Sequence, residues 1–350
     1  MTIILATGGT GGHIFPAITL AKELKEQCYN CVVFTDKKIN KNTDIQSYVL
    51  PLCKSSGNAI HKLKFFSLFS YSCALALYKM KELKPKLVIG FGSYASFPTL
   101  LAAKILSTPI ILHEQNIVLG RVNRFFFKSA KLVATSFPTT KYVEGDKCVL
   151  TGNFIDIETQ DYPNTEGILN ILIIAGSQGA NFFDNVVGSV ICNLPKKLKK
   201  KIRIIAQCTK KNIDRVESLY KSKKIDFELS EFFDDMQQQL ANAHLVISRA
   251  GATSIAEITL ARRPAIYIPY PHSKDNHQFY NAKYIEDLNA AVIVEQNSKA
   301  KKNLTELLIS LLSNHQKLHD MASNTKKTEI KNGITKFTEI IKTNNSHPKT

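Results

Sequence analysis

The 350-residue sequence has no tryptophan and no apolar run long enough to span a membrane. A transmembrane helix needs about 20 consecutive apolar residues, so no integral membrane anchor is expected. The first residues, Met1 to Ala6, lack a cationic start, and their apolar stretch is too short for a signal peptide. We therefore expect the chain to stay on the cytoplasmic side of any membrane that it touches.

Acidic residues are scarce, because 29 Asp and Glu stand against 46 Lys and Arg and give a formal net charge of +17. An excess of this size favours anionic partners, which include nucleic acid, anionic lipid headgroups and phosphorylated substrates. No zinc-finger spacing and no RNA-binding aromatic signature occurs, so nucleic acid is not expected. The sequence also lacks any Asp-x-Asp pair. A diphosphate clamped by a catalytic metal is therefore not predicted.

The seven cysteines are an odd number and are spread along the chain. Cys28 and Cys31 have the spacing of a redox or zinc pair, but no second pair follows them. We favour buried thiols in a reducing compartment over such a site.

Short apolar strands alternate with helix-period segments from end to end, which predicts an α/β fold with two doubly wound parallel-sheet domains. The polar stretch 154–169 contains Pro163, has no periodicity and is expected to link an N-terminal domain, 1–153, to a C-terminal domain, 170–331. A helix at 332–344 is expected to complete the first domain. The expected strands are Thr2–Thr7, Cys31–Asp36, Lys86–Phe91, Pro109–His113, Lys131–Thr135, Lys147–Thr151, Asn170–Ala175, Lys201–Cys208, Ile225–Glu231, His244–Arg249, Ala265–Tyr270 and Ala290–Glu295. The expected helices are Ile14–Gln27, Phe66–Lys84, Ser96–Leu106, Leu119–Lys128, Asn181–Asn193, Asn212–Ser222, Asp234–Ala243, Ser254–Arg262, His277–Leu288, Asn303–Ser313, His315–Glu329 and Ile334–Lys342.

A glycine loop, Gly8 to Gly12, follows the first expected strand and ends at His13. Ligands of open α/β sheets bind at the carboxyl ends of the strands, so this loop should line a groove between the two domains. Glycines let backbone N–H groups approach an anion, and the helix dipole favours negative charge there. The spacing fits neither a Walker A loop nor the Rossmann fingerprint. A tight strand–helix turn is the alternative, and we favour a functional loop.

Further polar loops follow other expected strands. Gly90-Phe-Gly-Ser-Tyr94 and His113-Glu-Gln-Asn116 belong to the first domain, and four consecutive polar residues after a strand favour a site. Ala175-Gly-Ser-Gln-Gly-Ala180 in the second domain is a phosphate-type turn. The stretch from Ser248 to Glu257 is ambiguous, because Ser254 and Glu257 could form a helix capping box without any ligand.

Together these stretches resemble the MurG family of N-acetylglucosaminyltransferases, which have the GT-B fold of two Rossmann-like domains. The resemblance spans nearly the entire chain, with the motifs in family order. The matching stretches are Gly8-Gly-Thr-Gly-Gly-His-Ile-Phe-Pro16, Gly90-Phe-Gly-Ser-Tyr94, His113-Glu-Gln-Asn116, Gly176-Ser-Gln-Gly-Ala180, Phe232-Phe-Asp-Asp-Met236, Arg249-Ala-Gly-Ala-Thr-Ser-Ile-Ala-Glu257 and Asp275-Asn-His-Gln278.

The resemblance implies transfer of GlcNAc from UDP-GlcNAc to the 4-hydroxyl of muramoyl lipid I, with inversion, in peptidoglycan synthesis at the cytoplasmic face of the bacterial inner membrane. It implies His13 as general base, with Tyr94, His113 and Glu114 as secondary catalytic candidates. UDP-GlcNAc and lipid I would be substrates, no cofactor or metal is implied, and other cell-wall synthesis proteins are candidate partners. The implied substrate-binding residues are Thr10, Gly11, Gly12, Asn116, Ser177, Gln178, Phe233, Arg249, Ala252, Thr253, Ser254, Glu257 and Gln278.

The sequence departs from the family pattern at three points. After Thr151-Gly-Asn153 the family usually continues Pro-x-Arg, whose arginine approaches the donor phosphates, whereas this chain reads Phe154-Ile155-Asp156. An acid cannot take that role, so we do not assign it to Asp156. His277 stands where a glutamine is usual, and Asp184 where an asparagine is common.

Aromatic and cationic residues interleave at Lys62, Lys64, Phe65, Phe66 and Phe69, and again between Arg121 and Lys128. Core-facing helix positions explain the individual aromatics. As a group they suit a patch on an enzyme that works at an anionic membrane surface.

Three alternatives to the transferase remain at this point. A UDP-GlcNAc 2-epimerase-like isomerase would share the fold and the donor, and another glycolipid glycosyltransferase would differ in the acceptor. A basic membrane- or nucleic-acid-binding protein would not be an enzyme.

Overall fold

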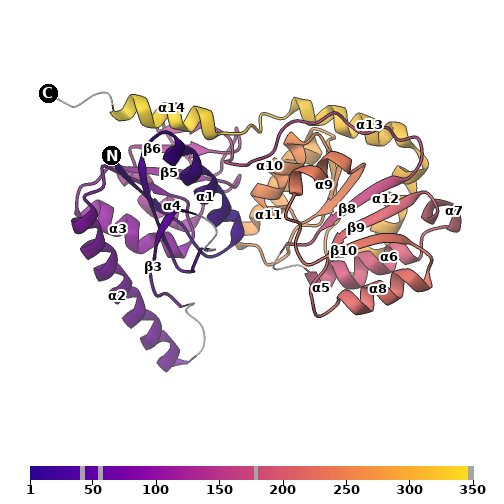
Figure 1. Cartoon of the computed structure of the whole chain (residues 1–350), viewed down its shortest axis with the longest axis horizontal. Helices are drawn as coiled ribbons and strands as arrows, with labels where there is room; N and C mark the ends of the chain where they lie inside the picture. The colour runs from indigo at the N-terminus through magenta and orange to yellow at the C-terminus, as the bar shows by residue number, and fades with distance from the viewer. Residues whose placement is uncertain (40–43, 54–57, 177–179, 346–350) are drawn as a thin grey trace. The chain divides into compact units, whose positions relative to one another are not determined.

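The computed structural model describes residues 1–39, 44–53, 58–176 and 180–345. The chain forms two compact units (Figure 1). Unit 1 contains Met1–Ile155 and Ile330–Thr350, and unit 2 contains Asp156–Glu329. Both units are α/β, so the predicted fold class is confirmed.

Unit 1 is built on a 7-stranded sheet with the order β3-β2-β1-β4-β5-β6-β7 over the described residues. Every neighbouring pair of strands is parallel. The strands are β1 (Thr2–Ala6), β2 (Asn30–Thr35), β3 (Gln46–Val49), β4 (Leu87–Gly90), β5 (Ile110–Glu114), β6 (Leu132–Thr135) and β7 (Cys148–Leu150).

Helices cover both faces of this sheet, as the continuous apolar strands predict. On β1, Ile3 and Leu5 pack with the core beneath α1 (Gly11–Glu26) and α14 (Ile334–Asn345). Ile4 points to the other face, because side chains alternate along a strand. That face is covered by α2 (Ala59–Leu83), α3 (Phe97–Ile105) and α4 (Arg121–Phe126). Figure 1 shows α2 as the long helix of unit 1. Two short helices, η1 (Tyr94–Ser96) and η2 (Phe127–Ser129), also belong to this unit.

Unit 2 repeats the plan with a 6-stranded sheet of order β10-β9-β8-β11-β12-β13, again parallel throughout the described part. Its strands are β8 (Leu169–Ile174), β9 (Ile202–Gln207), β10 (Asp226–Ser230), β11 (Leu245–Ser248), β12 (Ala265–Tyr267) and β13 (Ala291–Ile293). Its helices are α5 (Ala180–Phe182), η3 (Phe183–Val187), α6 (Gly188–Cys192), α7 (Lys196–Lys199), α8 (Ile213–Ser222), α9 (Met236–Asn242), α10 (Ala252–Leu260), η4 (Lys274–Asn276), α11 (His277–Asp287), α12 (Ala300–Ser313), α13 (His315–Asn324) and η5 (Thr325–Lys327).

The structure differs from the expected elements in several places. Strand β3 was not expected, because its edge position gives it a half-exposed pattern and not an apolar run. Helix α2 begins at Ala59 and not at Phe66, since Asn58 caps it by accepting a hydrogen bond from the His61 N–H at 3.3 Å. The helix expected to reach Glu329 ends at Asn324 and continues only as η5.

The segment expected to be a linker, 154–169, contains no helix or strand before Leu169, where β8 begins one residue before its expected start. The segment is nevertheless packed. Phe154 and Ile155 are buried in unit 1. Farther along, the Tyr162 hydroxyl donates to the His244 carbonyl at 2.8 Å and holds the segment against unit 2.

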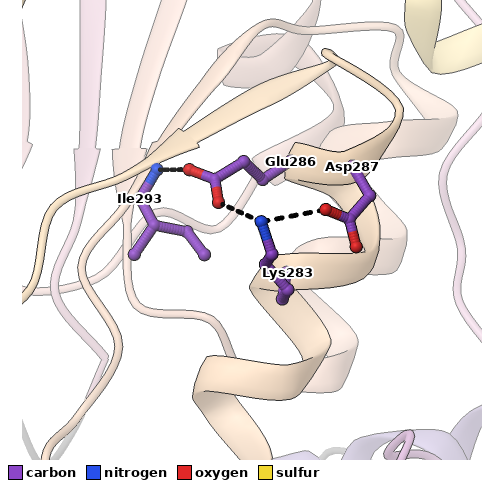
Figure 2. A network of polar contacts seen from close by, with 4 residues as sticks. All are labelled: Lys283, Glu286, Asp287 and Ile293. Atoms are coloured by element: carbon purple, nitrogen blue, oxygen red, sulfur yellow. Dashed lines mark hydrogen bonds and ion pairs between the residues drawn. The ribbon is translucent and has the colours of Figure 1, made fainter.

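Helix α11 is tied to β13 by a small polar network (Figure 2). Glu286 accepts a hydrogen bond from the backbone N–H of Ile293 at 2.8 Å. Lys283 lies between two carboxylates, at 3.0 Å from Glu286 and 2.9 Å from Asp287. The edge strand β13 is thereby held to the helix that precedes it.

All seven cysteines are free thiols. Cys31, Cys192 and Cys208 are buried, as expected, but Cys28 is exposed. Burial raises the pKa of the Cys31 thiol to about 11, so it stays protonated at neutral pH. Buried thiols of this kind behave as small apolar side chains.

Candidate active site

The polar loops of each unit gather where its strand order reverses. In unit 1 the order reverses between β1 and β4, and in unit 2 between β8 and β11. Ligands of doubly wound sheets bind at the carboxyl ends of the strands at this switch point. Gly8–Gly12 and Gly92–Tyr94 follow the two strands of unit 1, and Gly176 and Arg249–Gly251 follow those of unit 2. Ser177 and Gln178, which were expected to bind substrate, lie outside the described residues.

The glycine loop of unit 1 is held in one shape. Gly8 has φ +148°, and a Cβ at this position would meet the Asp36 carboxylate and the Ala95 side chain. The N–H of Gly9 donates to Asp36 Oδ1 at 2.9 Å, and the Thr7 hydroxyl donates to the His13 carbonyl at 2.7 Å. These bonds fix the direction in which α1 leaves the loop.

Helix α1 begins at Gly11, and its N-cap residue, Thr10, makes no side-chain capping bond. The N–H groups of His13 and Ile14 donate to the Thr10 carbonyl. No described residue accepts a hydrogen bond from the N–H groups of Gly11 and Gly12. Unused N–H groups and the positive end of the helix dipole make this start suitable for an anion.

His13 stands on the first turn of α1 with one ring nitrogen engaged. Its Nδ1 lies 2.9 Å from the Phe91 carbonyl and 3.0 Å from Gln115 Oε1. A carbonyl oxygen can only accept, so Nδ1 carries the proton and Nε2 is the basic nitrogen. In this tautomer of the neutral ring, Nε2 is the nitrogen that can act as a general base.

His113 does not belong among the catalytic residues, where it was expected. Its side chain has no exposed surface and stacks on Phe154 with ring centroids 4.0 Å apart. Burial lowers its pKa to about 4, so the ring is neutral. Its Nε2 donates to the Gly152 carbonyl at 3.0 Å, and its Nδ1 accepts from Gln115 Nε2 at 3.0 Å. No substrate reaches a ring enclosed in this way.

Glu114, also expected as a catalytic candidate, is likewise enclosed by the protein. Its carboxylate is buried and accepts four hydrogen bonds at the end of β5. The donors are the N–H and side-chain amide of Asn116 at 3.0 and 3.2 Å, the Gly120 N–H at 2.8 Å and Asn123 Nδ2 at 2.9 Å. Glu114 therefore shapes the loop that presents Asn116, and no lone pair is left for proton transfer.

Tyr94 and Asp36 form a clamp beside the glycine loop. The Tyr94 hydroxyl donates to Asp36 Oδ2 at 3.0 Å. Burial and the neighbouring carboxylate raise the pKa of Tyr94 to about 12, so it stays protonated. Sequence reasoning did not single out Asp36. The signal was present, because Asp36 directly follows β2, the neighbour of β1.

In unit 2, α10 carries four of the expected donor-binding residues. Its N-cap is Gly251, and Ala252, Thr253 and Ser254 form its first turn. The capping-box interpretation is wrong, because Ser254 lies inside the helix and not at the N-cap. Gly251 has no side chain with which to cap the helix, so the N–H groups of this turn are also suited to a ligand.

Glu257 is half-buried one turn further along α10. Burial raises the pKa of its carboxyl to about 7. Within the described part of the chain no hydrogen bond or ion pair reaches this carboxylate. A partly buried carboxylate with no protein donor is suited to accept hydrogen bonds from a ligand.

Arg249 is buried at the end of β11, with its guanidinium engaged inside unit 2. It donates to the carbonyls of Ile268 and Pro269 at 2.8 and 3.3 Å and to Gln296 Oε1 at 2.7 Å. The rings of Phe182, Phe183 and Tyr270 lie 5.0 to 5.6 Å from it. Arg249 thus holds together the loops after three strands of the unit.

Phe233 lies in the loop between β10 and α9, and Gln278 lies in the first turn of α11. The Phe233 ring is buried, which anchors the backbone just before Asp235 caps α9. Gln278 Oε1 accepts from the Tyr270 N–H at 2.9 Å, and its amide nitrogen is a hydrogen-bond donor.

Comparison with known proteins decides the family. Residues 3–135 match the glycosyltransferase family 28 N-terminal domain, and residues 170–337 match its C-terminal domain. The UDP-N-acetylglucosamine–N-acetylmuramyl-(pentapeptide) pyrophosphoryl-undecaprenol N-acetylglucosamine transferase of Wolbachia pipientis wMel is 74% identical, covering 97% of this chain and 98% of that protein. The protein of the same name from Anaplasma marginale is 41% identical over 97% of this chain and 98% of its own length. The crystal structure of Acinetobacter baumannii MurG is 28% identical, has a TM-score of 0.81 and covers 98% of this chain and 99% of that one.

The chain belongs to the MurG family of glycosyltransferases. Two of its departures from the MurG family pattern have a structural role. Asp184 accepts hydrogen bonds from Thr209 at 3.2 Å and Asn212 at 2.7 Å, tying the helix after β8 to the loop after β9. Phe154, which stands in place of the family's proline, packs against His113 and Phe337. Asp156 is exposed at the first position of unit 2.

The aromatic patch of this MurG family member is continuous. Phe65 packs on Phe66 and Phe69 at 5.6 and 5.8 Å, and Phe69 reaches Phe97 at 5.4 Å. Phe66 is 63% exposed, and Lys62 and Lys64 are also exposed on α2. No helix of the described residues is long and apolar enough to cross a membrane.

Proposed function

We propose that this protein transfers GlcNAc from UDP-GlcNAc to the 4-hydroxyl of the muramoyl sugar of lipid I, with inversion, to give lipid II for peptidoglycan synthesis. The observation that carries the proposal is 74% identity over 97% of the chain to a transferase named for this reaction. Four of the glycine-containing loops follow β1, β4, β8 and β11, the strands at the switch points of the two sheets.

Unit 2 is proposed to hold the donor. Glu257 would accept hydrogen bonds from the two ribose hydroxyls, and these donors would satisfy its solitary carboxylate. The backbone at Phe233 would meet the uracil edge. The first turn of α10, from Ala252 to Ser254, and Gln278 would hold the sugar, while Arg249 keeps the surrounding loops in place.

Unit 1 is proposed to hold the acceptor and the base. Thr10, Gly11 and Gly12 would receive the acceptor diphosphate at the start of α1, where N–H groups are free to bind an anion. Nε2 of His13 would take the proton of the attacking hydroxyl, since Nδ1 is already protonated. Asn116, held by Glu114, would contribute to binding of the transferred sugar.

The departing UDP develops negative charge, which the loop and helix start after Gly176 would stabilise. No metal is part of the proposal, because the sequence lacks an Asp-x-Asp pair. Turnover is therefore expected to persist in excess EDTA. Loss of turnover that one divalent ion alone restores would contradict the metal-free mechanism.

The decisive test is transfer of labelled GlcNAc to a lipid I analogue. The wild type is expected to form a β-linked product and release UDP, whereas His13→Ala should lose about 10² to 10⁴ in kcat, the usual contribution of a general base. His315→Ala, on α13, serves as the matched control. Unchanged turnover in His13→Ala would remove His13 as the base.

The same assay separates the alternatives. An epimerase would convert UDP-GlcNAc without any acceptor, and another glycolipid transferase would prefer a competing acceptor over lipid I. A purely binding protein would release no UDP.

Membrane attachment through the aromatic patch is also part of the proposal. Exposed Phe66 and the flanking lysines suit an anionic leaflet, in which the acceptor lipid is anchored. Replacement of Lys62, Lys64, Phe65, Phe66 and Phe69 by serine should weaken binding to anionic vesicles while donor affinity is kept. Vesicle binding equal to that of the wild type would exclude this patch.

A further inference from the structure

We infer that Gln115 is a positioning residue that fixes the tautomer and orientation of His13 through a directed chain of hydrogen bonds ending at the Gly152 carbonyl. The inference rests on the proposed role of His13 as base. It assigns a function to two buried residues that make no contact with substrate.

The series of hydrogen bonds joins His13, Gln115, His113 and the Gly152 carbonyl. His13 Nδ1 lies 3.0 Å from Gln115 Oε1, and Gln115 Nε2 lies 3.0 Å from His113 Nδ1. His113 Nε2 lies 3.0 Å from the Gly152 carbonyl. The His13 nitrogen also meets the Phe91 carbonyl at 2.9 Å.

The two backbone carbonyls set the direction of every bond between them. Carbonyl oxygens only accept, so the Gly152 oxygen requires a proton on His113 Nε2, and the Phe91 oxygen requires one on His13 Nδ1. A neutral imidazole carries one proton. His113 Nδ1 is then a bare acceptor that needs a donor.

Gln115 fits this arrangement in only one orientation. Its NH₂ must face the bare nitrogen of His113, and its oxygen must face the protonated nitrogen of His13. A flipped amide would put two donors together at His13 and two acceptors together at His113, and each mismatch leaves a buried polar group unpaired. The proton on His113 Nε2 therefore fixes the orientation of the Gln115 amide, and the amide in turn fixes the proton of His13 on Nδ1.

The far end of the chain is rigid. The His113 ring stacks on Phe154 at 4.0 Å and also contacts Phe337, which α14 brings into the same core. Gly152 cannot carry a side chain, since a Cβ there would meet the Lys331 carbonyl. The close approach of the backbone at Gly152 and Lys331 therefore holds the Gly152 carbonyl in place.

Gln115 supplies what the Phe91 carbonyl alone does not. One acceptor fixes a proton on Nδ1, but two acceptors in different directions also fix the rotation of the ring. Nε2 is then both bare and aimed, which a base that abstracts a hydroxyl proton requires.

Gln115→Met tests the inference, because methionine has nearly the same length and shape without the amide. We expect kcat for GlcNAc transfer to fall about tenfold, the scale of one lost hydrogen bond, with KM for UDP-GlcNAc unchanged. In a His13→Ala background the same substitution should change kcat less than about twofold, because its only route to the reaction is gone. Gln316→Met on α13 is the matched control.

The second measurement does not use activity. In ¹⁵N spectra of the full-length protein with labelled histidine, His13 should show a protonated Nδ1 and a bare Nε2, and His113 the reverse. Gln115→Met should broaden or shift the His13 signals alone. If the wild-type His13 carries its proton on Nε2, or if Gln115→Met lowers kcat equally in the His13→Ala background, the inference is wrong. If the tautomers are as expected but the wild type transfers no GlcNAc, the proposed function fails and the chain of hydrogen bonds stands.

Discussion

The two units share a strand order but treat the polar groups at their switch points in opposite ways. In unit 1 the protein itself satisfies the functional side chains: Glu114 has four donors and Asp36 two. In unit 2 the Glu257 carboxylate has no described partner, and Thr253 Oγ1 and Arg249 Nε are buried without a hydrogen bond.

The difference separates two tasks. A group that moves a proton must be held in place before the reaction, because misplacement costs rate. A group that binds a nucleotide gains affinity when the ligand satisfies it, and an unpaired buried acceptor strongly discriminates against ligands without donors. On the proposed roles, the carboxylates of unit 1 are preorganised for chemistry, and Glu257 of unit 2 is left for the ligand to satisfy.

The largest effect on donor affinity is expected at Glu257. Glu257→Ala removes a charged acceptor for which the protein offers no substitute, so UDP-GlcNAc affinity should fall about 100-fold, or roughly 3 kcal/mol. Isothermal titration calorimetry on the full-length protein measures it, with Glu306→Ala on the exposed side of α12 as control. A loss below about threefold would mean that unit 2 does not bind its donor through this carboxylate.

The pH dependence of Glu257 sharpens the same comparison. Its pKa is about 7 in the folded unit, against 4.5 for an unburied carboxyl. Between these values the folded state holds the extra proton, so this group makes the free energy of unfolding fall as the pH rises. Without ligand, Glu257→Gln should therefore raise the unfolding temperature at pH 8 and leave it unchanged at pH 4.

Donor binding should follow the opposite trend, because the ribose hydroxyls favour the carboxylate. The affinity of the wild type for UDP-GlcNAc should increase as the pH rises through about 7, and that of Glu257→Gln should not. Equal pH profiles for the two proteins would show that Glu257 does not titrate in this range.

Much of the fold could be predicted from the sequence, because buried parallel strands leave continuous apolar runs. The runs around Ile3 and Ile171 define the centres of both sheets. Edge strand β3 leaves no such signal, and the N-terminal turns of α2 are exposed and lack an apolar stripe.

The positions of the site loops could be predicted from the sequence, but the hydrogen-bond and packing partners of their residues could not. Glycines and polar residues after strands located the loops, and the family resemblance named their roles. Only coordinates could show that His113 and Glu114 face inwards, since burial depends on residues as distant in sequence as Phe337. The capping-box pattern at Ser254 failed because the N-cap of α10 is Gly251, three residues earlier than that pattern requires.

A smaller effect is expected for the clamp of unit 1. Asp36→Ala leaves the Gly9 N–H and the Tyr94 hydroxyl without their acceptor and frees the glycine loop. We expect kcat/KM for the lipid I analogue to fall about 30-fold, since two hydrogen bonds are lost and each contributes about 1 kcal/mol. Donor affinity should not change. Tyr94→Phe, which removes one of the two bonds, should lie between Asp36→Ala and the wild type. An equal loss of donor affinity in Asp36→Ala would erase the proposed division between the units.

The smallest effect is expected at the network of Lys283, Glu286 and Asp287 in unit 2, where the charged side chains have partners within the protein. Glu286→Ala removes the acceptor of the Ile293 N–H and one partner of Lys283 (Figure 2). The backbone bond is half-buried, so we expect a loss of about 1 kcal/mol in the free energy of unfolding, or a few degrees in Tm. Asp287→Ala, which touches only the exposed end of Lys283, should change Tm less. Neither variant should alter UDP-GlcNAc affinity, because this network closes on itself and offers no unpaired group to a ligand. A donor affinity that falls with Glu286→Ala would show that incompleteness at Glu257 does not explain donor binding by unit 2.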